Sequence, residues 1–181
     1  MRMGIAILVV AVCAAGVVAF AAASSSSPGS QLDEARNATA AFQNFDNLPA
    51  EFGELKDTAG IACIAMPEMP GMPAGAMGIH YVNGGRVADP REIASRPEAI
   101  IYEPQTNGTK RLVAVEYVVL QSAWDATHSS RPVLFGQQFN FTPSPNRFGL
   151  PPFYSLHAWI WKNNPAGMFA MFNPDVTCAF A

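Results

Sequence analysis

Three residues carry the side chains of a metal site that holds its ion through two imidazoles and one carboxylate: His80, Glu116 and His157. Each lies in a short stretch rich in β-branched and aromatic residues, which is typical of a β-strand. Antiparallel strands can bring single residues together from distant positions. The spacing itself is not diagnostic, because the sequence has no HxH or HExxH pair.

Three interpretations of these residues stay open. They can hold a transition metal, either Zn or Cu. They can serve as the acid–base groups of a small hydrolase or isomerase, in which Glu116 works with His157 or His80. Alternatively, Glu116 and one histidine form a buried hydrogen-bonded pair that only orders the core.

The surroundings of Glu116 make it the most informative of the three. Residues 111–121 (RLVAVEYVVLQ) are apolar on both faces of an expected strand, so this strand should be central and covered on both sides. An unpaired buried carboxylate is costly or has a raised pKa, so Glu116 needs a partner or a function. We expect a nitrogen of His80 or His157 within about 2.7–3.2 Å of it. A metal site requires three donor atoms within about 4 Å of one another and an open position facing a cleft.

A second group of possible ligands lies in residues 66–78 (MPEMPGMPAGAMG), where proline and glycine predict an irregular loop. Met66, Met69 and Met72 have the spacing of thioether motifs that hold Cu(I) in exported copper-handling proteins. Thioether sulfur is soft and neutral at any pH, so it suits Cu(I). In the alternative interpretation these methionines fill irregular gaps beneath the loop.

The N-terminus has the features of an export signal. Arg2 precedes an apolar stretch at residues 4–20, and Ala19, Phe20 and Ala21 form a small-x-small cleavage site. We therefore expect a signal peptide at residues 1–23, a flexible linker at 24–30 and a single globular domain at 31–181. An uncleaved membrane anchor is the alternative.

Cysteine usage agrees with export. After cleavage only Cys63 and Cys178 remain, and two distant cysteines in an exported protein most often form a disulfide. The chain-entropy model gives a bridge across such a long loop a stabilisation of about 4–5 kcal/mol. Two buried free thiols are the alternative.

The composition limits the kinds of molecule that the protein can bind. Of 181 residues, 50% are hydrophobic and 14% are charged, with a net charge of −3, which is a globular composition. The absence of a basic run of five residues argues against nucleic acid as a partner. We expect a metal ion or a small molecule as partner and no membrane contact once the signal peptide is removed. The oligomeric state is open.

The order of elements predicts an α+β fold with a mainly antiparallel sheet of about five strands and two or three short helices. Asn107 and Gly108 predict a hairpin that places Ala99 opposite Glu116 and Glu103 opposite Leu112. Aromatic residues beside the Pro-Pro pair at 151–152 can line an apolar small-molecule pocket. The expected helices are 31–47 and short segments starting at Asp89 and Asn164, and the expected strands are 61–64, 79–82, 99–103, 111–121, 133–141 and 153–161.

Several strings of the sequence resemble a group of uncharacterised exported bacterial proteins. They are residues 78–83 (GIHYVN), 115–119 (VEYVV), 156–162 (LHAWIWK) and 164–167 (NPAG). The match would cover most of residues 60–178. The resemblance implies a secreted single domain and no known activity. The sequence therefore favours a secreted protein that binds a metal or a small ligand, with a small hydrolase or isomerase, or a structural extracellular domain, as alternatives.

Overall fold

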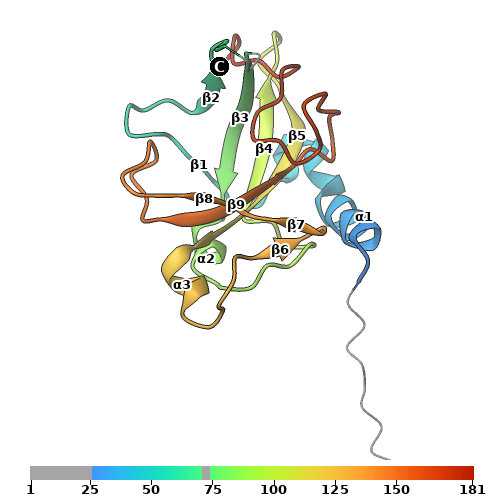
Figure 1. The fold of residues 1–181 in the computed structure, drawn as a ribbon. Helices are drawn as coiled ribbons and strands as arrows, with labels where there is room; N and C mark the ends of the chain where they lie inside the picture. Colours follow the sequence, from blue (N-terminus) through green and yellow to red (C-terminus); the bar gives the residue numbers. More distant parts are fainter. Residues whose placement is uncertain (1–25, 71–73) are drawn as a thin grey trace, which may run out of the picture.

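The computed structural model of the chain describes residues 26–70 and 74–181 (Figure 1). Within these residues the fold is α+β, as the sequence predicts, with one seven-stranded antiparallel sheet, a two-stranded sheet and three short α-helices. The expected signal peptide, residues 1–23, lies outside the described residues. The main sheet has the order β1-β3-β4-β5-β9-β8, and β2 pairs with β3. Its strands are β1 (Gly53–Glu54), β2 (Cys63–Met66), β3 (Gly75–Val82), β4 (Ala99–Pro104), β5 (Lys110–Leu120), β8 (Asn140–Thr142) and β9 (Phe153–Ala158).

The hairpin of β4 and β5 contains both a confirmed and a wrong register prediction. Ala99 faces Glu116, as the Asn-Gly turn predicts. Nearer the turn the register shifts by one residue, so Glu103 faces Arg111 instead of Leu112. The cause is a β-bulge, in which β5 carries one more residue than β4 and the pairing slips. The pairs beside the turn are displaced by one residue from those of a turn centred on Asn107 and Gly108, so the bulge restores the expected pairing at Glu116.

A second bulge shapes β3, which begins inside the expected methionine-rich loop. The register with β2 shifts between Ile64 and Ala65, which leaves Met77 without a partner on β2. The next residue, Gly78, has φ +100°, a conformation that favours glycine. A Cβ there would lie 2.6 Å from the carbonyl oxygen of Tyr102 on β4. Only glycine allows β3 and β4 to approach this closely.

The N-terminal helix covers one face of the sheet. Helix α1 (Pro28–Thr39) begins three residues before the expected start, inside the segment assigned to a linker. The reason is a capping signal, because the Ser27 side chain accepts a hydrogen bond from the Ser30 amide and proline follows the cap. Beyond Thr39 the helix tightens into two 3₁₀ turns, residues 40–43 and 45–47. Ala35 and the partly buried Phe42 and Phe45 belong to the larger hydrophobic core on this face.

The expected strand 133–141 is wrong, because the chain reverses within it. The segment forms a hairpin of β6 (Val133–Leu134) and β7 (Gln137–Gln138), and then enters β8. Phe135 and Gly136 form the turn with φ values of 54° and 71°. Two consecutive positive φ values match the twist of a tight hairpin, so Gly136 marks a turn and not a bulge.

The helices expected at Asp89 and Asn164 do not form. Short helices α2 (Gly84–Val87) and α3 (Gln121–Asp125) occur instead. The Asp89 carboxylate pairs with Arg91. The Asn164 side chain accepts a hydrogen bond from the amide two residues on, which closes a local turn. Polar side chains that bond to nearby backbone favour turns as readily as helix starts.

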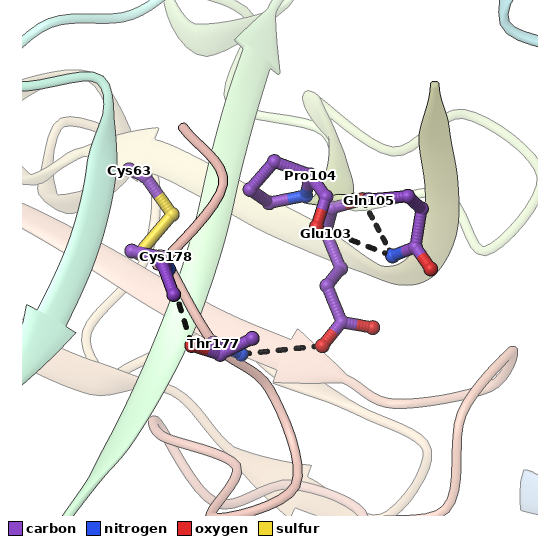
Figure 2. Close-up of a disulfide and its surroundings, with 7 residues drawn as sticks. Cys63, Glu103, Pro104, Gln105, Thr177 and Cys178 are labelled. Atoms are coloured by element: carbon purple, nitrogen blue, oxygen red, sulfur yellow. Dashed lines mark hydrogen bonds between the residues drawn. A yellow bond between two sulfur atoms is a disulfide. The ribbon is translucent and has the colours of Figure 1, made fainter. Parts of the chain in front are cut away.

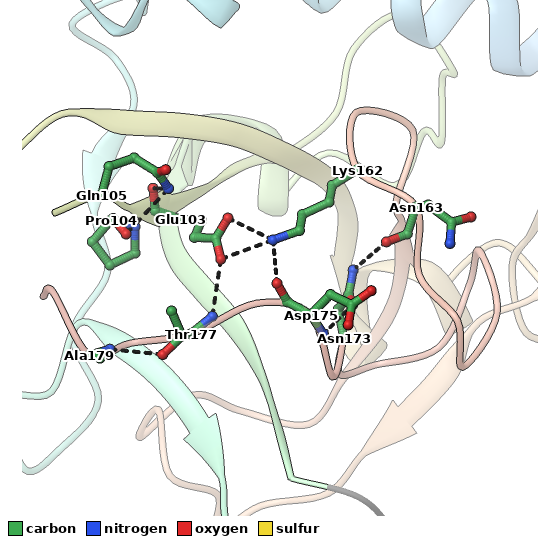
Figure 3. A network of polar contacts seen from close by, with 9 residues as sticks. All are labelled: Glu103, Pro104, Gln105, Lys162, Asn163, Asn173, Asp175, Thr177 and Ala179. Atoms are coloured by element: carbon green, nitrogen blue, oxygen red, sulfur yellow. Dashed lines mark hydrogen bonds and ion pairs between the residues drawn. The ribbon is translucent and has the colours of Figure 1, made fainter.

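The C-terminal segment is fixed to the sheet in two ways. A disulfide joins Cys63 to Cys178 across 115 residues, as the sequence predicts, with the Cα atoms 5.6 Å apart (Figure 2). Nearby, the buried Glu103 carboxylate accepts hydrogen bonds from Lys162 Nζ at 2.8 and 3.0 Å and from the Thr177 amide at 3.2 Å (Figure 3). These contacts hold the last residues against β2 and β4.

Candidate metal centre

The main sheet brings His80, Glu116 and His157 together. They lie on β3, β5 and β9, and Glu116 faces His157 directly across the β5–β9 pair. His80 Nε2 is 3.4 Å from His157 Nε2 and 3.5 Å from Glu116 Oε2. His157 Nδ1 is 3.4 Å from Glu116 Oε1. One donor atom from each of the three residues can be chosen so that all lie within 4.8 Å of one another.

A small residue on β4 allows this convergence. Strand β4 separates β3 from β5, so the side chains of His80 and Glu116 must meet across it. Ala99 faces Val82 on one side and Glu116 on the other, and Ile101 faces His80. Since Ala99 adds only a methyl group to the row of Glu116, the carboxylate can reach over β4 toward His80.

The distances differ from those expected for a buried hydrogen-bonded pair. The nitrogen–oxygen distances from Glu116 to His80 and His157 are 3.5 and 3.4 Å, longer than the expected 2.7–3.2 Å. Donors about 2.0–2.1 Å from a tetrahedral zinc ion lie about 3.3–3.4 Å apart. Two of the measured contacts share His80 Nε2, whereas the third uses the other ring nitrogen of His157 and the other oxygen of Glu116, so the three distances are not the edges of one set of donor atoms. The full donor set is somewhat wider than the 4 Å that we expected.

Burial sets the charge of the three groups. His80 and His157 are 3% and 2% exposed, and burial lowers the pKa of each imidazole to about 4. For His80 the Glu116 carboxylate opposes this effect. Burial also raises the pKa of Glu116, while His80 and a hydrogen bond from Ser155 lower it. Both imidazoles are thus neutral at neutral pH, with lone pairs free for a metal.

One nitrogen of the centre has no hydrogen bond. His80 Nδ1 is buried and finds no hydrogen-bond partner within the described residues. Histidines that ligate metals usually donate their second N–H to a fixed acceptor. The position of the His80 ring therefore depends on its packing and on its contacts to Glu116 and His157.

The three side chains line a cavity of about 450 Å³. Its volume lies within the range of small-molecule sites. Phe148, Pro151 and Phe153 line it, so the expected pocket beside the Pro-Pro pair is confirmed. Other apolar lining residues are Leu55, Met77, Val118, Leu120 and Leu150. The centre therefore adjoins an apolar space that a ligand can enter, as a binding site or an active site requires.

Other candidate residues lie elsewhere. His128 is exposed and stacks on Trp124, with ring centroids 3.8 Å apart. Met66 ends β2 and Met69 is 40% exposed, while Met72 lies outside the described residues. Binding of Cu(I) by these methionines stays a prediction.

Sequence reasoning missed Met77 and misplaced Trp161. Met77 was expected in an irregular loop, whereas it lies on β3 beside the bulge before Gly78 and lines the cavity. The expected strand 153–161 would place Trp161 on the face of His157, but β9 ends at Ala158 and Trp161 donates a hydrogen bond to Thr39 of α1.

No family model, curated protein or solved structure matches the chain. The resemblance to exported bacterial proteins therefore stays a prediction. Among residues 26–70 and 74–181, no helix has the length and apolar character needed to cross a bilayer.

Proposed function

We propose that this is an exported metal-binding protein whose centre, His80, Glu116 and His157, holds a divalent zinc or copper ion. The observation that carries the proposal is that the three buried side chains converge, so that one donor atom from each can be chosen with all three within 4.8 Å of one another. Donors this close can share one ion after small side-chain movements. Two imidazoles and one carboxylate are donors that both zinc and copper accept.

The protonation of the centre supports the same function. A metal displaces protons from its ligands, so binding is strongest where the ligands carry none. With pKa values near 4, both imidazoles are already free of protons at neutral pH. Glu116 keeps a side-chain exposure of 11%, the largest of the three, which suits a carboxylate facing the cavity.

Export is supported by the disulfide. Bridges such as Cys63–Cys178 persist in oxidising compartments and are rare in reducing ones. The apolar stretch at residues 4–20 provides the expected signal. A location outside the cytosol would also expose the centre to the metal supply of that compartment.

Metal titration tests the function. Protein purified without a histidine tag is stripped with a chelator and titrated with Zn²⁺ or Cu²⁺ in a calorimeter, and the bound metal is measured by mass spectrometry. We expect about one ion per chain for the wild type. His157→Ala should lose this binding, whereas His128→Ala should keep it, because His128 is exposed and outside the centre.

Circular dichroism of each variant separates loss of metal from loss of fold. If His157→Ala does not fold, Glu116→Gln replaces it in the same titration. A wild-type protein that takes up neither ion, or a folded centre variant that binds as the wild type does, would contradict the proposal.

A further inference from the structure

The cavity beside the centre is polar at one place and apolar around it. Besides the three donors and Ser155, its polar lining side chains within the described residues are Glu54 and Thr142. Glu54 already accepts a hydrogen bond from the Tyr81 hydroxyl at 3.1 Å and lies 3.7 Å from Lys56 Nζ. Most of the remaining lining is aliphatic or aromatic. A ligand that fills this space needs an apolar body and one polar end directed at the centre.

The volume limits the size of that ligand. The cavity holds about 450 Å³. At about 30 Å³ per non-hydrogen atom, the share that a water molecule has in the liquid, there is room for about fifteen such atoms. A chain of about ten carbons with a small head group fits, whereas a peptide of several residues or an oligosaccharide does not.

The charge of the metal-loaded centre determines which chemical group the polar end of the ligand must carry. A divalent ion on two neutral imidazoles and one carboxylate leaves a net charge of +1. This charge would lie beside apolar walls, where an unpaired charge is costly. Three protein donors also leave a coordination position open. An anionic oxygen donor at the end of the ligand would balance the charge and fill that position.

We infer that the cavity binds an apolar monocarboxylate of about ten carbons, with its carboxylate on the metal of the centre and its chain against Val118, Leu120 and Phe153. This inference rests on the proposed function, because without the ion the carboxylate would meet the acidic Glu116 and no positive charge. No lysine or arginine of the described residues lines the cavity to take the place of the ion.

Calorimetry with decanoate tests the inference on the full chain. Decanoate has about twelve non-hydrogen atoms, which the cavity can hold. Zinc-loaded protein should bind decanoate at least about tenfold more tightly than metal-free protein, because a direct ion contact is absent from the latter. Decanol, which has the same chain without the charge, should bind zinc-loaded protein at least about tenfold more weakly than decanoate.

A variant in the cavity wall tests ligand binding separately from metal binding. Val87 is partly buried at the end of α2 and lines the cavity, so Val87→Phe should reduce decanoate binding at least about tenfold by filling space, while zinc uptake stays unchanged. Ala126→Phe is the matched control, because Ala126 is exposed at the end of α3 and does not line the cavity. This control variant should bind both decanoate and zinc as the wild type does.

The outcomes distinguish the two proposals. Failure of the wild type to take up either zinc or copper would overturn the proposed function and the inference with it. Normal zinc uptake with no decanoate binding, equal binding with and without zinc, equal binding of decanol, or unchanged binding by Val87→Phe would overturn the inference alone.

Discussion

Glu116→Gln separates a metal centre from a structural pair. Glutamine keeps the shape of the side chain and removes its anionic donor. An ion present at about a hundred times its Kd stabilises a protein by about 2.7 kcal/mol. For a chain of this size each kcal/mol corresponds to about 2–4 °C in Tm, so the wild type should gain about 5–10 °C with zinc. The variant should gain about a degree or less.

The metal-free variant should melt close to the metal-free wild type. Burial raises the pKa of Glu116, so an ionised carboxylate there is costly and its removal relieves that cost. If Glu116 served mainly to hold the core together, the change would instead lower the Tm of the metal-free protein and leave the response to zinc unaltered.

Thermal melts followed by circular dichroism, with and without zinc, provide the measurement. Glu103→Gln is the matched control, because Glu103 is also a buried glutamate but pairs with Lys162, away from the centre. This control should lower the Tm of the metal-free protein and keep the gain with zinc. An equal gain with zinc in Glu116→Gln and the wild type would refute the metal centre.

Three further predictions concern residues that shape or stabilise the fold around the centre. Gly78→Ala should lower the free energy of unfolding by about 1–3 kcal/mol and weaken zinc binding, both measurable in urea and zinc titrations, because the new Cβ would lie 2.6 Å from the Tyr102 carbonyl oxygen at a positive φ. The double change of Cys63 and Cys178 to alanine should cost about 4–5 kcal/mol in the same urea assay, and an unchanged midpoint would contradict a stabilising bridge. Burial raises the pKa of Glu98 to about 9, so the folded state holds a proton that the unfolded state releases above its ordinary pKa, and stability should fall as the pH rises toward 9. Glu98→Gln should make this fall shallower between about pH 5 and about pH 9, and an unchanged slope would contradict that role.

The convergence of the centre was predictable because one residue broke a pattern. Glu116 stands alone on an apolar face of the central strand, so it needed polar partners, and strand histidines were the available ones. The pairing of Ala99 with Glu116 agrees with an Asn-Gly turn only because the β-bulge offsets a one-residue displacement beside the turn. Local chemistry was therefore enough for the first prediction and not for the second.

The cavity was only partly predictable, because bulges change which side chains face it. Met77 lines it from β3 beside the bulge before Gly78, although the proline and glycine around it predicted an irregular loop. The turn at Phe135 was missed because a phenylalanine with positive φ is uncommon. The prediction of short helices at Asp89 and Asn164 was wrong, because the side chains of these two residues form local contacts that compete with helix capping.

The order of the strands has a consequence for how the protein would acquire its ion. His80 and His157 are 77 residues apart, and Glu116 reaches His80 across a strand that must already be in place. Unlike ligands within one short loop, these donors cannot gather in an unfolded chain without a large loss of entropy. A metal bound at this centre would therefore not nucleate folding and would enter a finished sheet through the cavity. For an exported chain, the ion it carries would be chosen by the compartment in which folding ends, not by the one in which it is synthesised.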